Sequence, residues 1–402
     1  MTDKIDKIFD SFVENNLFRN KTILQSNYTP EDIPHREEQI ERIASILAPC
    51  LRGEKVSNLF LYGNTGTGKT LTINHIGNKL MLKDKELGSD SLKFMCVNCK
   101  LGKTSETEYR ILARLINELG GSVPSTGLPT SDVYNRFVDL IDSKKQVVLI
   151  ALDEIDHAVE KISDEFIYNL TRLNSGLKNA QISLIGISNS LTFMDNIDPR
   201  VRSSLGEEEV VFSPYNALQL QDILKKRADV AFKKDVLEEG AIAKCAAYAA
   251  REHGDARRAL NLLRVAGELA ERENSNRILL SHIDAANEKI ERDKTLDIIV
   301  GEPKQFQIVL FAIVRLDEQK KEGGMFTGDV YGTYKEICEK LKIEVLTPRR
   351  ISDILGELDM LGIITAQEIS KGRYGRTREI KLAISSNIKD EAKEILKKAL
   401  EI

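Results

Sequence analysis

The sequence has few cysteines, no long apolar run and no excess of basic residues. The five cysteines among its 402 residues are scattered, which is typical of a reducing cytosol and speaks against a disulfide scaffold. No apolar run approaches the roughly 18 residues of a membrane span, so we expect a cytoplasmic protein without a transmembrane helix or a secretory signal. The formal net charge of −4 means that any binding of nucleic acid must depend on a local basic patch.

A glycine-rich segment follows the apolar run at residues 58–62 and opens a helical pattern that continues to Leu80. Its residues are Gly63, Asn64, Thr65, Gly66, Thr67, Gly68, Lys69 and Thr70. After a strand and before a helix, the pattern G-x-x-x-x-G-K-T is typical of a loop that cradles phosphates with its backbone N–H groups. Lys69 would contact the β- and γ-phosphates, and Thr70 would coordinate Mg²⁺. The segment therefore predicts a nucleoside triphosphate and Mg²⁺ as ligands.

Two adjacent carboxylates, Asp153 and Glu154, end a continuous apolar run at residues 147–152. Such a run suits a parallel strand that is buried on both faces. The carboxyl ends of parallel strands are where open α/β sheets place their ligands. We expect Asp153 to hold the Mg²⁺ environment and Glu154 to polarise the attacking water. Asn189, which follows a further strand at 181–188, could orient that water, although asparagine also begins turns well.

The first half of the chain alternates strand and helix patterns. Apolar strand candidates lie at residues 58–62, 92–97, 147–152, 181–188 and 209–212. Together with the intervening helices, they predict a three-layer α/β domain with a five-stranded sheet that ends near Ser213.

Residues 217–294 have only helical patterns. Asp255 is a good N-cap for a helix whose first turn contains Arg257 and Arg258. The helix dipole disfavours cations in a first turn, so these arginines favour an anion opposite them. The alternative is that the two arginines are ordinary surface residues, which the helix tolerates in its first turn at a small energetic cost. This alternative is stronger for Arg258 than for Arg257.

The last hundred residues predict a winged helix-turn-helix domain. Helices are expected at 304–319 and 329–341, and a third begins at Thr347-Pro348, followed by strands at 363–369 and 377–383. The predicted buried stripe of the third helix is Ile351, Ile354, Leu355, Leu358 and Leu361. In such domains the third helix enters the major groove of DNA.

Basic residues gather on this third helix and on the hairpin that follows it. The candidate DNA contacts are Arg349, Arg350, Lys371, Arg373, Tyr374, Arg376 and Arg378. A glycine-flanked basic hairpin suits phosphate contacts, which position a protein on DNA. Many winged domains bind only proteins, however, and Asp353 and Glu357 on the outer face leave base-specific recognition by the helix open.

Several segments, in this order, resemble the archaeal replication initiators, which are AAA+ ATPases related to the eukaryotic origin recognition complex and its cell-division-cycle partner. They are G-N-T-G-T-G-K-T, L-D-E-I-D, I-S-N-S, D-P-R-V-R-S-S-L, G-D-A-R-R-A-L and the winged ending. The resemblance extends from about Tyr28 to Leu382, and it includes the box from Tyr28 to Glu37 and the Tyr331-Gly-Thr-Tyr334 segment.

The resemblance implies three domains. They are an AAA+ domain over residues 1–213 with an inserted helix at about 101–119, a helical lid over 214–299 and a winged-helix DNA-binding domain over 300–402. It also implies a nucleoid-associated protein that binds ATP or ADP with Mg²⁺ and hydrolyses ATP slowly, as a switch. Its implied partners are double-stranded origin DNA, the replicative helicase and other copies or paralogues of the chain.

Particular residues take roles from the same resemblance. Asn189 would be sensor 1 and Arg257 sensor 2, and Tyr28 and Arg36 would lie near the adenine. The inserted helix would offer Lys103, Arg110 and Arg114 to DNA. Eukaryotic relatives have arginine where this chain has Ser204, so the trans-acting arginine finger falls to Arg202 or Arg200.

Two other functions stay open at this stage. A branch-migration motor is also an AAA+ protein that can end in a winged domain, but it predicts fast, DNA-stimulated turnover. A signalling ATPase whose winged domain binds protein usually has sensor repeats after that domain, and only about 20 residues follow the wing here.

Overall fold

The structure is a computed structural model that describes residues 16–25, 28–100, 107–124, 126–319, 324–370 and 376–402. The chain divides into two compact units, Met1–Asp284 and Ala285–Ile402. Among the helices of the described ranges, none is long and apolar enough to cross a membrane.

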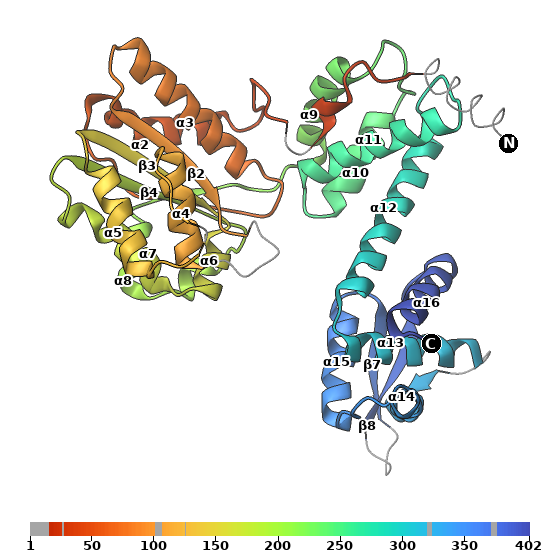
Figure 1. Ribbon diagram of the computed structural model, residues 1–402. Coiled ribbons are helices and arrows are strands. Elements are labelled where there is room, and N and C mark those ends of the chain that lie inside the picture. The colour runs from red at the N-terminus through yellow and green to blue at the C-terminus, as the bar shows by residue number, and fades with distance from the viewer. Residues whose placement is uncertain (1–15, 26–27, 101–106, 125, 320–323, 371–375) are drawn as a thin grey trace. The chain divides into compact units, whose positions relative to one another are not determined.

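A parallel sheet of five strands forms the core of the α/β part of the first unit (Figure 1). The strands are β1 (Leu59–Tyr62), β2 (Leu92–Asn98), β3 (Gln146–Asp153), β4 (Ala180–Ser188) and β5 (Glu208–Val211), in the order β2-β3-β4-β1-β5. All eight residues of β3 are buried, as its apolar run predicts. The predicted five-stranded α/β fold is therefore confirmed.

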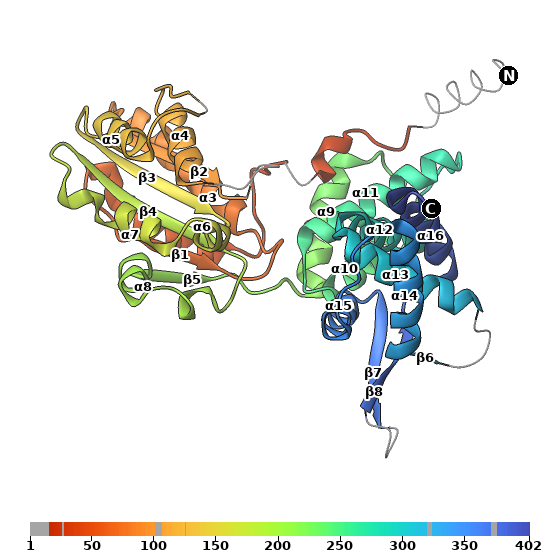
Figure 2. The same cartoon turned by 60° about the horizontal axis from the view of Figure 1, so that its bottom comes forward.

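Helices cover both faces of this sheet (Figure 2). On one face lie α2 (Glu37–Leu47), the 3₁₀ turn η2 (Ala48–Arg52) and α3 (Lys69–Glu86). On the other lie α4 (Glu108–Glu118), α5 (Thr130–Ile141), α6 (Ile155–Lys161), α7 (Asp164–Arg172) and α8 (Pro199–Leu205), with the short turns η3 (Leu173–Ser175) and η4 (Phe193–Asp195). Successive residues of β3 point alternately to the two helical layers, so the sheet has one apolar core on each of its faces.

The parallel arrangement brings the ends of distant segments together. The glycine-rich loop follows β1, Asn98 ends β2, Asp153 ends β3 and Asn189 follows β4. Because all these strands run in one direction, the four segments meet at one edge of the sheet.

A bundle of helices completes the first unit. It consists of α9 (Ala217–Ala231), α10 (Ala241–Arg251), α11 (Ala256–Arg272) and the beginning of α12 (Leu280–Gly301). Asp255 caps α11 as predicted, because its Oδ1 accepts hydrogen bonds from the amides of Arg257 (2.7 Å) and Arg258 (3.2 Å). The helix α12 continues from this bundle into the second unit.

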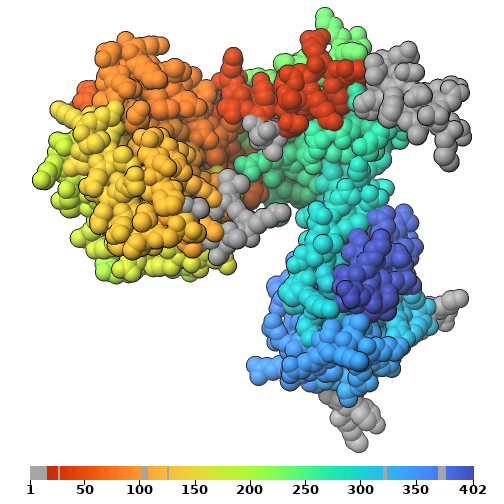
Figure 3. Space-filling view, viewed as in Figure 1, coloured from red at the N-terminus to blue at the C-terminus, as the bar shows by residue number. Residues whose placement is uncertain are grey.

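The segment before α2 lies across this bundle (Figure 3). The amide of Leu17 donates to Oε1 of the buried Glu271 at 2.9 Å, and the ring of Phe18 stacks on Phe232 at 4.7 Å. The short turn η1 (Lys21–Leu24) follows. This packing leads the chain from the helical bundle to the segment at 28–36.

In the part of the second unit that the structure describes, there are a small antiparallel sheet and five helical segments. After the end of α12 come α13 (Lys304–Gln319), β6 (Met325–Phe326), α14 (Thr327–Leu341), α15 (Pro348–Met360), β7 (Ile364–Ser370), β8 (Arg376–Leu382) and α16 (Ser386–Leu400). The strand order is β6-β8-β7, and α16 packs against α13. The predicted winged helix-turn-helix is confirmed, whereas β6 and α16 are additions that the sequence did not indicate.

One predicted core residue of this unit is wrong. Ile351, Ile354, Leu355 and Leu358 are buried as expected, but Leu361 is 39% exposed. The helix α15 ends at Met360, and Leu361 is its C-cap residue. The helical periodicity of the sequence extends to Leu361, but the helix has already ended there, so the pattern wrongly predicts that Leu361 is buried.

Candidate functional site

The glycine-rich loop adopts a conformation that side chains would prevent at two positions. Gly66 has φ +68°, and a Cβ there would lie 1.7 Å from Oδ1 of Asp255. A Cβ on Gly63 would lie 2.2 Å from the carbonyl oxygen of Phe212. The loop is thus packed tightly against both the helical bundle and the end of β5.

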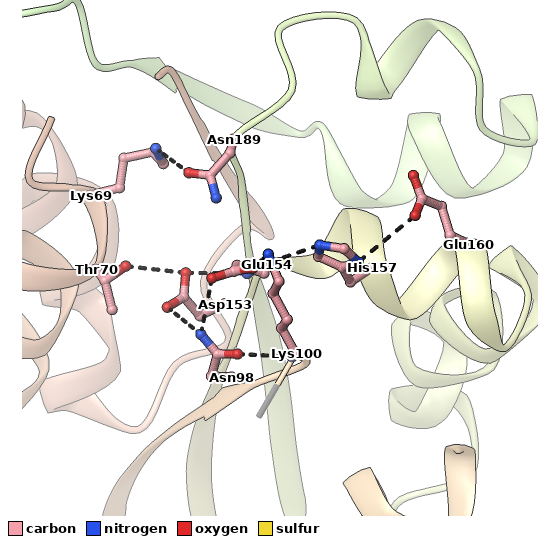
Figure 4. A network of polar contacts seen from close by, with 9 residues as sticks. All are labelled: Lys69, Thr70, Asn98, Lys100, Asp153, Glu154, His157, Glu160 and Asn189. Carbon is pink, nitrogen blue, oxygen red and sulfur yellow. Dashed lines mark hydrogen bonds and ion pairs between the residues drawn. The ribbon is translucent and has the colours of Figure 1, made fainter. Parts of the chain in front are cut away.

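Lys69, the first residue of α3, turns its ammonium group back onto this loop (Figure 4). It donates to the carbonyl oxygens of Gly63 (2.7 Å) and Asn64 (2.8 Å) and to Oδ1 of Asn189 (2.9 Å). Burial lowers the pKa of Lys69 to about 8. The hydrogen bonds place the ammonium group of Lys69 between the loop and the end of β4. Phosphate oxygens of a bound nucleotide could replace the oxygens of Gly63, Asn64 and Asn189 as its acceptors.

Thr70 and Asp153 meet at the end of β3. The hydroxyl of Thr70 donates to Oδ1 of Asp153 at 3.1 Å, and burial raises the pKa of that carboxyl group. No cluster of three or more His, Cys, Asp or Glu side chains in the described ranges could hold a metal ion. A hydroxyl and a single carboxylate nevertheless fit Mg²⁺, because this ion is typically held by one or two protein oxygens together with substrate phosphates and waters.

Glu154 has a strained backbone and a crowded carboxylate. Its φ of 55° and ψ of 47° are left-handed, which is costly for a residue with a side chain. Its Oε1 accepts from Nδ2 of Asn98 at 3.5 Å, and its Oε2 lies 3.6 Å from Nζ of Lys100 and 3.9 Å from Nε2 of His157. Both carboxylate oxygens are therefore engaged by neighbouring groups (Figure 4).

Asn98 was not predicted as a site residue. It pairs with Asp153 in the parallel register of β2 and β3, and its Nδ2 donates to Oδ2 of Asp153 at 3.2 Å. The carbonyl of Asn98 accepts from Nη1 of Arg114 at 2.9 Å. An amide at the end of a parallel strand is the signal that singled out Asn189, and it could have identified Asn98 too.

A cavity of about 400 Å³ lies beside the loop. Its lining includes Tyr28, Gly66, Gly68, Thr70, Tyr215, Arg227 and Arg257. The guanidinium of Arg227 lies 4.6 Å from the centre of the Tyr28 ring. Tyr28, which is distant from the loop in sequence, and Arg257 from α11 are thus brought to one cavity with Thr70.

Arg36 does not line this cavity, and its side chain is buried against the backbone of the glycine-rich loop. It is 4% exposed, its Nε donates to the carbonyl of Thr67 at 2.8 Å, and its Nη2 donates to the carbonyl of Ser213 at 2.6 Å. The guanidinium also lies 4.0 Å from the centre of the Tyr215 ring. These contacts give Arg36 a supporting role at the loop, and its place near the adenine stays a prediction.

The two candidates for an arginine finger lie on α8 and are exposed. Arg200 is bidentate to Asp198, with distances of 3.0 and 2.8 Å, and that pairing lowers the pKa of Asp198. Arg202 makes a looser contact of 3.4 Å with Asp195. Arg202 would give up a weaker ion pair than Arg200 if it turned to a nucleotide phosphate, so Arg202 stays the preferred candidate for the arginine finger.

The predicted inserted helix is part of the α/β core where the structure describes it. Ile111, Leu112, Leu115 and Ile116 of α4 are fully buried. Arg110 and Arg114 lie on α4 and are half-buried, and Lys103 falls outside the described residues. DNA contact by these residues stays a prediction.

The basic residues of the second unit have unequal positions. Arg349 and Arg350 are exposed in the first turn of α15, and Arg350 lies 3.8 Å from Asp353. Arg378 instead turns inward, because its Nη1 donates to the carbonyl of Ser352 at 3.1 Å. Lys371, Arg373, Tyr374 and the side chain of Arg376 fall outside the described residues.

Comparison with protein-family models and known proteins identifies this combination of domains. An AAA domain matches residues 54–194, a Cdc6 AAA+ ATPase-type lid domain 221–288 and a CDC6 C-terminal winged helix domain 297–392. The ORC1-type DNA replication protein of Pyrococcus furiosus is 51% identical over 388 residues, which cover 95% of this chain and 91% of the relative. This chain belongs to the ORC1-type DNA replication proteins. The resemblance inferred from its motifs is thereby confirmed.

Other ORC1-type proteins give the same result. ORC1-type DNA replication protein 1 of Sulfurisphaera tokodaii is 46% identical over 96% of this chain and 95% of its own length. Among solved structures, the Aeropyrum pernix ORC1 protein in complex with DNA is 42% identical and has a TM-score of 0.82, covering 95% of this chain and 97% of that one. Cdc6p from Pyrobaculum aerophilum, at 20% identity, 96% and 99% coverage and a TM-score of 0.58, shares the fold.

Proposed function

We propose that this chain is an ATP-binding replication initiator that binds double-stranded origin DNA. Its ATP or ADP state acts as a slow switch, and it helps to recruit or load the replicative helicase. The observation that carries the proposal is the joining, in one chain, of a glycine-rich loop facing Asp153 and Glu154 to a winged unit with arginines on α15. The DNA complex of a 42% identical ORC1 protein supports it.

The nucleotide site contains a residue for each step of hydrolysis. Lys69 would bind the β- and γ-phosphates, while Thr70 and Asp153 would hold Mg²⁺. When bound, Mg²⁺ neutralises charge on the phosphate oxygens. Glu154 would accept a proton from the attacking water, and Asn189, which contacts Lys69 at 2.9 Å, would orient that water.

Slow turnover follows from two features of the site. Asn98 and Lys100 contact the carboxylate of Glu154, so the attacking water would compete with these two groups for its oxygens. Arg257 would come from α11 of the same chain, but Arg202 would act only on the site of a neighbouring copy. An arginine finger is worth about 10³–10⁵ in rate, so an isolated copy should hydrolyse ATP slowly.

DNA binding would use the winged unit. Arg349 and Arg350 lie where the first turn of a helix enters the major groove, and the hairpin would place Lys371, Arg373 and Arg376 near phosphates. A protein with this function would be cytoplasmic and associated with the nucleoid.

A binding titration tests the proposal. Fluorescent duplexes from an origin and scrambled duplexes of equal length should be titrated at several salt concentrations with the parent and with Arg349→Ala/Arg350→Ala. We expect the variant to lose most of its preference for the origin duplex, since a good base contact is worth about 1–3 kcal/mol. Parental affinity of the variant for both duplexes would instead favour a winged unit that binds protein. Fast, DNA-stimulated hydrolysis by the parent would favour a motor.

A further inference from the structure

Two tyrosines of α14, Tyr331 and Tyr334, belong to the sequence pattern of the winged unit but are not candidates for a DNA contact. They lie one helical turn apart, and their rings stack with centroids 6.2 Å apart and an interplanar angle of 27°. Tyr334 is completely buried. Phenylalanine would fill the same volume, so the hydroxyl groups need a separate explanation.

The hydroxyl of Tyr334 joins two other segments. It donates to Oε1 of Gln305, on α13, at 2.6 Å, and it accepts from the amide of Leu346 at 3.1 Å. Burial raises the pKa of Tyr334 to about 12, so the group keeps its proton throughout the physiological range. Both hydrogen-bonding roles of this buried hydroxyl are therefore filled.

Two further hydrogen bonds hold the same turn. The hydroxyl of Tyr331 donates to the carbonyl of Leu346 at 3.3 Å, and Nε2 of Gln305 donates to the carbonyl of Glu344 at 3.1 Å. We call Gln305, Tyr331 and Tyr334 the tyrosine clasp. The two tyrosines of α14 thus bind the N–H and the C=O of Leu346, while Gln305 of α13 binds the carbonyl of Glu344.

The clasped turn leads directly into α15. Leu346 precedes Thr347, whose hydroxyl caps the helix by accepting from the amide of Arg350 at 3.4 Å. The apolar stripe of α15 fixes which face is buried, but packing is less directional than hydrogen bonds are. The backbone of Leu346 therefore sets where the first turn, with Arg349 and Arg350, begins.

We propose that the tyrosine clasp positions α15 for DNA: by holding residues 344–346, it fixes Arg349 and Arg350 in the orientation that recognises a base edge. The inference rests on the proposed function, because it requires that α15 meet DNA. It assigns no DNA contact to the clasp residues themselves.

The test compares Tyr334→Phe and Gln305→Glu with the parent, each in the full chain. Tyr334→Phe removes the hydroxyl but keeps the ring. Gln305→Glu keeps an acceptor for Tyr334 but loses the donor to Glu344. Tyr109→Phe is the matched control, because its hydroxyl also bonds a loop carbonyl, that of Pro124 at 2.5 Å, but in the first unit.

Binding is measured on origin and scrambled duplexes, well below the melting temperature. We expect both clasp variants to keep the parental affinity and salt slope on scrambled DNA. Their preference for the origin duplex should fall about tenfold, or about 1.4 kcal/mol. Hydrogen exchange of the Leu346 amide should accelerate in Tyr334→Phe. Tyr109→Phe should match the parent in every assay.

The outcomes separate the inference from the proposed function. A parent without preference for the origin duplex would refute the proposed recognition of DNA sequence, and the inference with it. If the parent discriminates and a folded Tyr334→Phe discriminates equally well, the clasp does not position α15. Equal losses on both duplexes would show that the hydroxyl serves folding alone. If Tyr334→Phe does not fold, parental discrimination by Gln305→Glu would overturn the inference.

Discussion

Arg36 should control nucleotide affinity without touching the nucleotide. Its guanidinium lies behind the glycine-rich loop, where it donates to the carbonyls of Thr67 and Ser213. Each of these two hydrogen bonds from a charged group contributes about 1.5–3 kcal/mol, or about 3–6 kcal/mol together, and part of this sum is offset by the cost of burying the charge. Arg36→Ala should therefore lower the free energy of unfolding by about 3 kcal/mol.

The consequence should be measurable in two assays. A loss of about 3 kcal/mol corresponds to a fall in melting temperature of about 6–10 °C for a unit of this size. Without the contact at Thr67 the loop can relax, so ATP affinity by equilibrium dialysis should fall about tenfold at a temperature where both proteins are folded. Arg36→Lys should be intermediate, because one ammonium cannot span both carbonyls as the guanidinium fork does.

The control is Arg52→Ala, which removes an exposed arginine paired with Glu54 at 2.8 Å. Such a surface pair contributes about 0–1 kcal/mol, so both assays should stay close to the parent. The reasoning about Arg36 would be refuted if Arg36→Ala loses stability but binds ATP with parental affinity. That result would mean that the glycine-rich loop keeps its conformation without the hydrogen bond from Arg36 to Thr67.

Three further predictions concern Lys69, Glu154 and Arg378. The pKa of Lys69 is lowered to about 8, so ATP affinity measured without Mg²⁺ should be constant below pH 8 and fall above it as the ammonium loses its charge. Lys69→Arg, which stays charged, should show no such fall, and rising affinity with pH would contradict the assignment. Glu154→Gln should bind ATP normally but release no phosphate, because an amide cannot accept the proton of water; parental turnover would assign Glu154 another role. Arg378→Ala should lower the melting temperature and leave the salt slope of DNA binding unchanged, whereas a phosphate contact would reduce that slope by about 0.9.

Local patterns in the sequence were sufficient to predict most of the fold. The glycine-rich loop directly follows β1 and directly precedes α3, and Asp153 directly ends the apolar run of β3. Both features are local in the sequence, so they could be recognised without knowledge of long-range contacts. The N-cap of α11 at Asp255 is equally local. Periodicity failed where an element ends, as at Leu361, and where an element is very short, as at β6.

The sequence by itself thus determined most of the elements, their order and the residues that follow the sheet strands. Only the tertiary structure decided which polar groups meet. Asn98 contacts Asp153 because β2 and β3 are neighbours in register, and Arg36 supports Thr67 across 31 positions of the chain. Tyr334 reaches Leu346 because α13, α14 and a turn converge. Periodicity reports whether a side chain is buried, whereas the partner of a buried polar group depends on how distant segments pack.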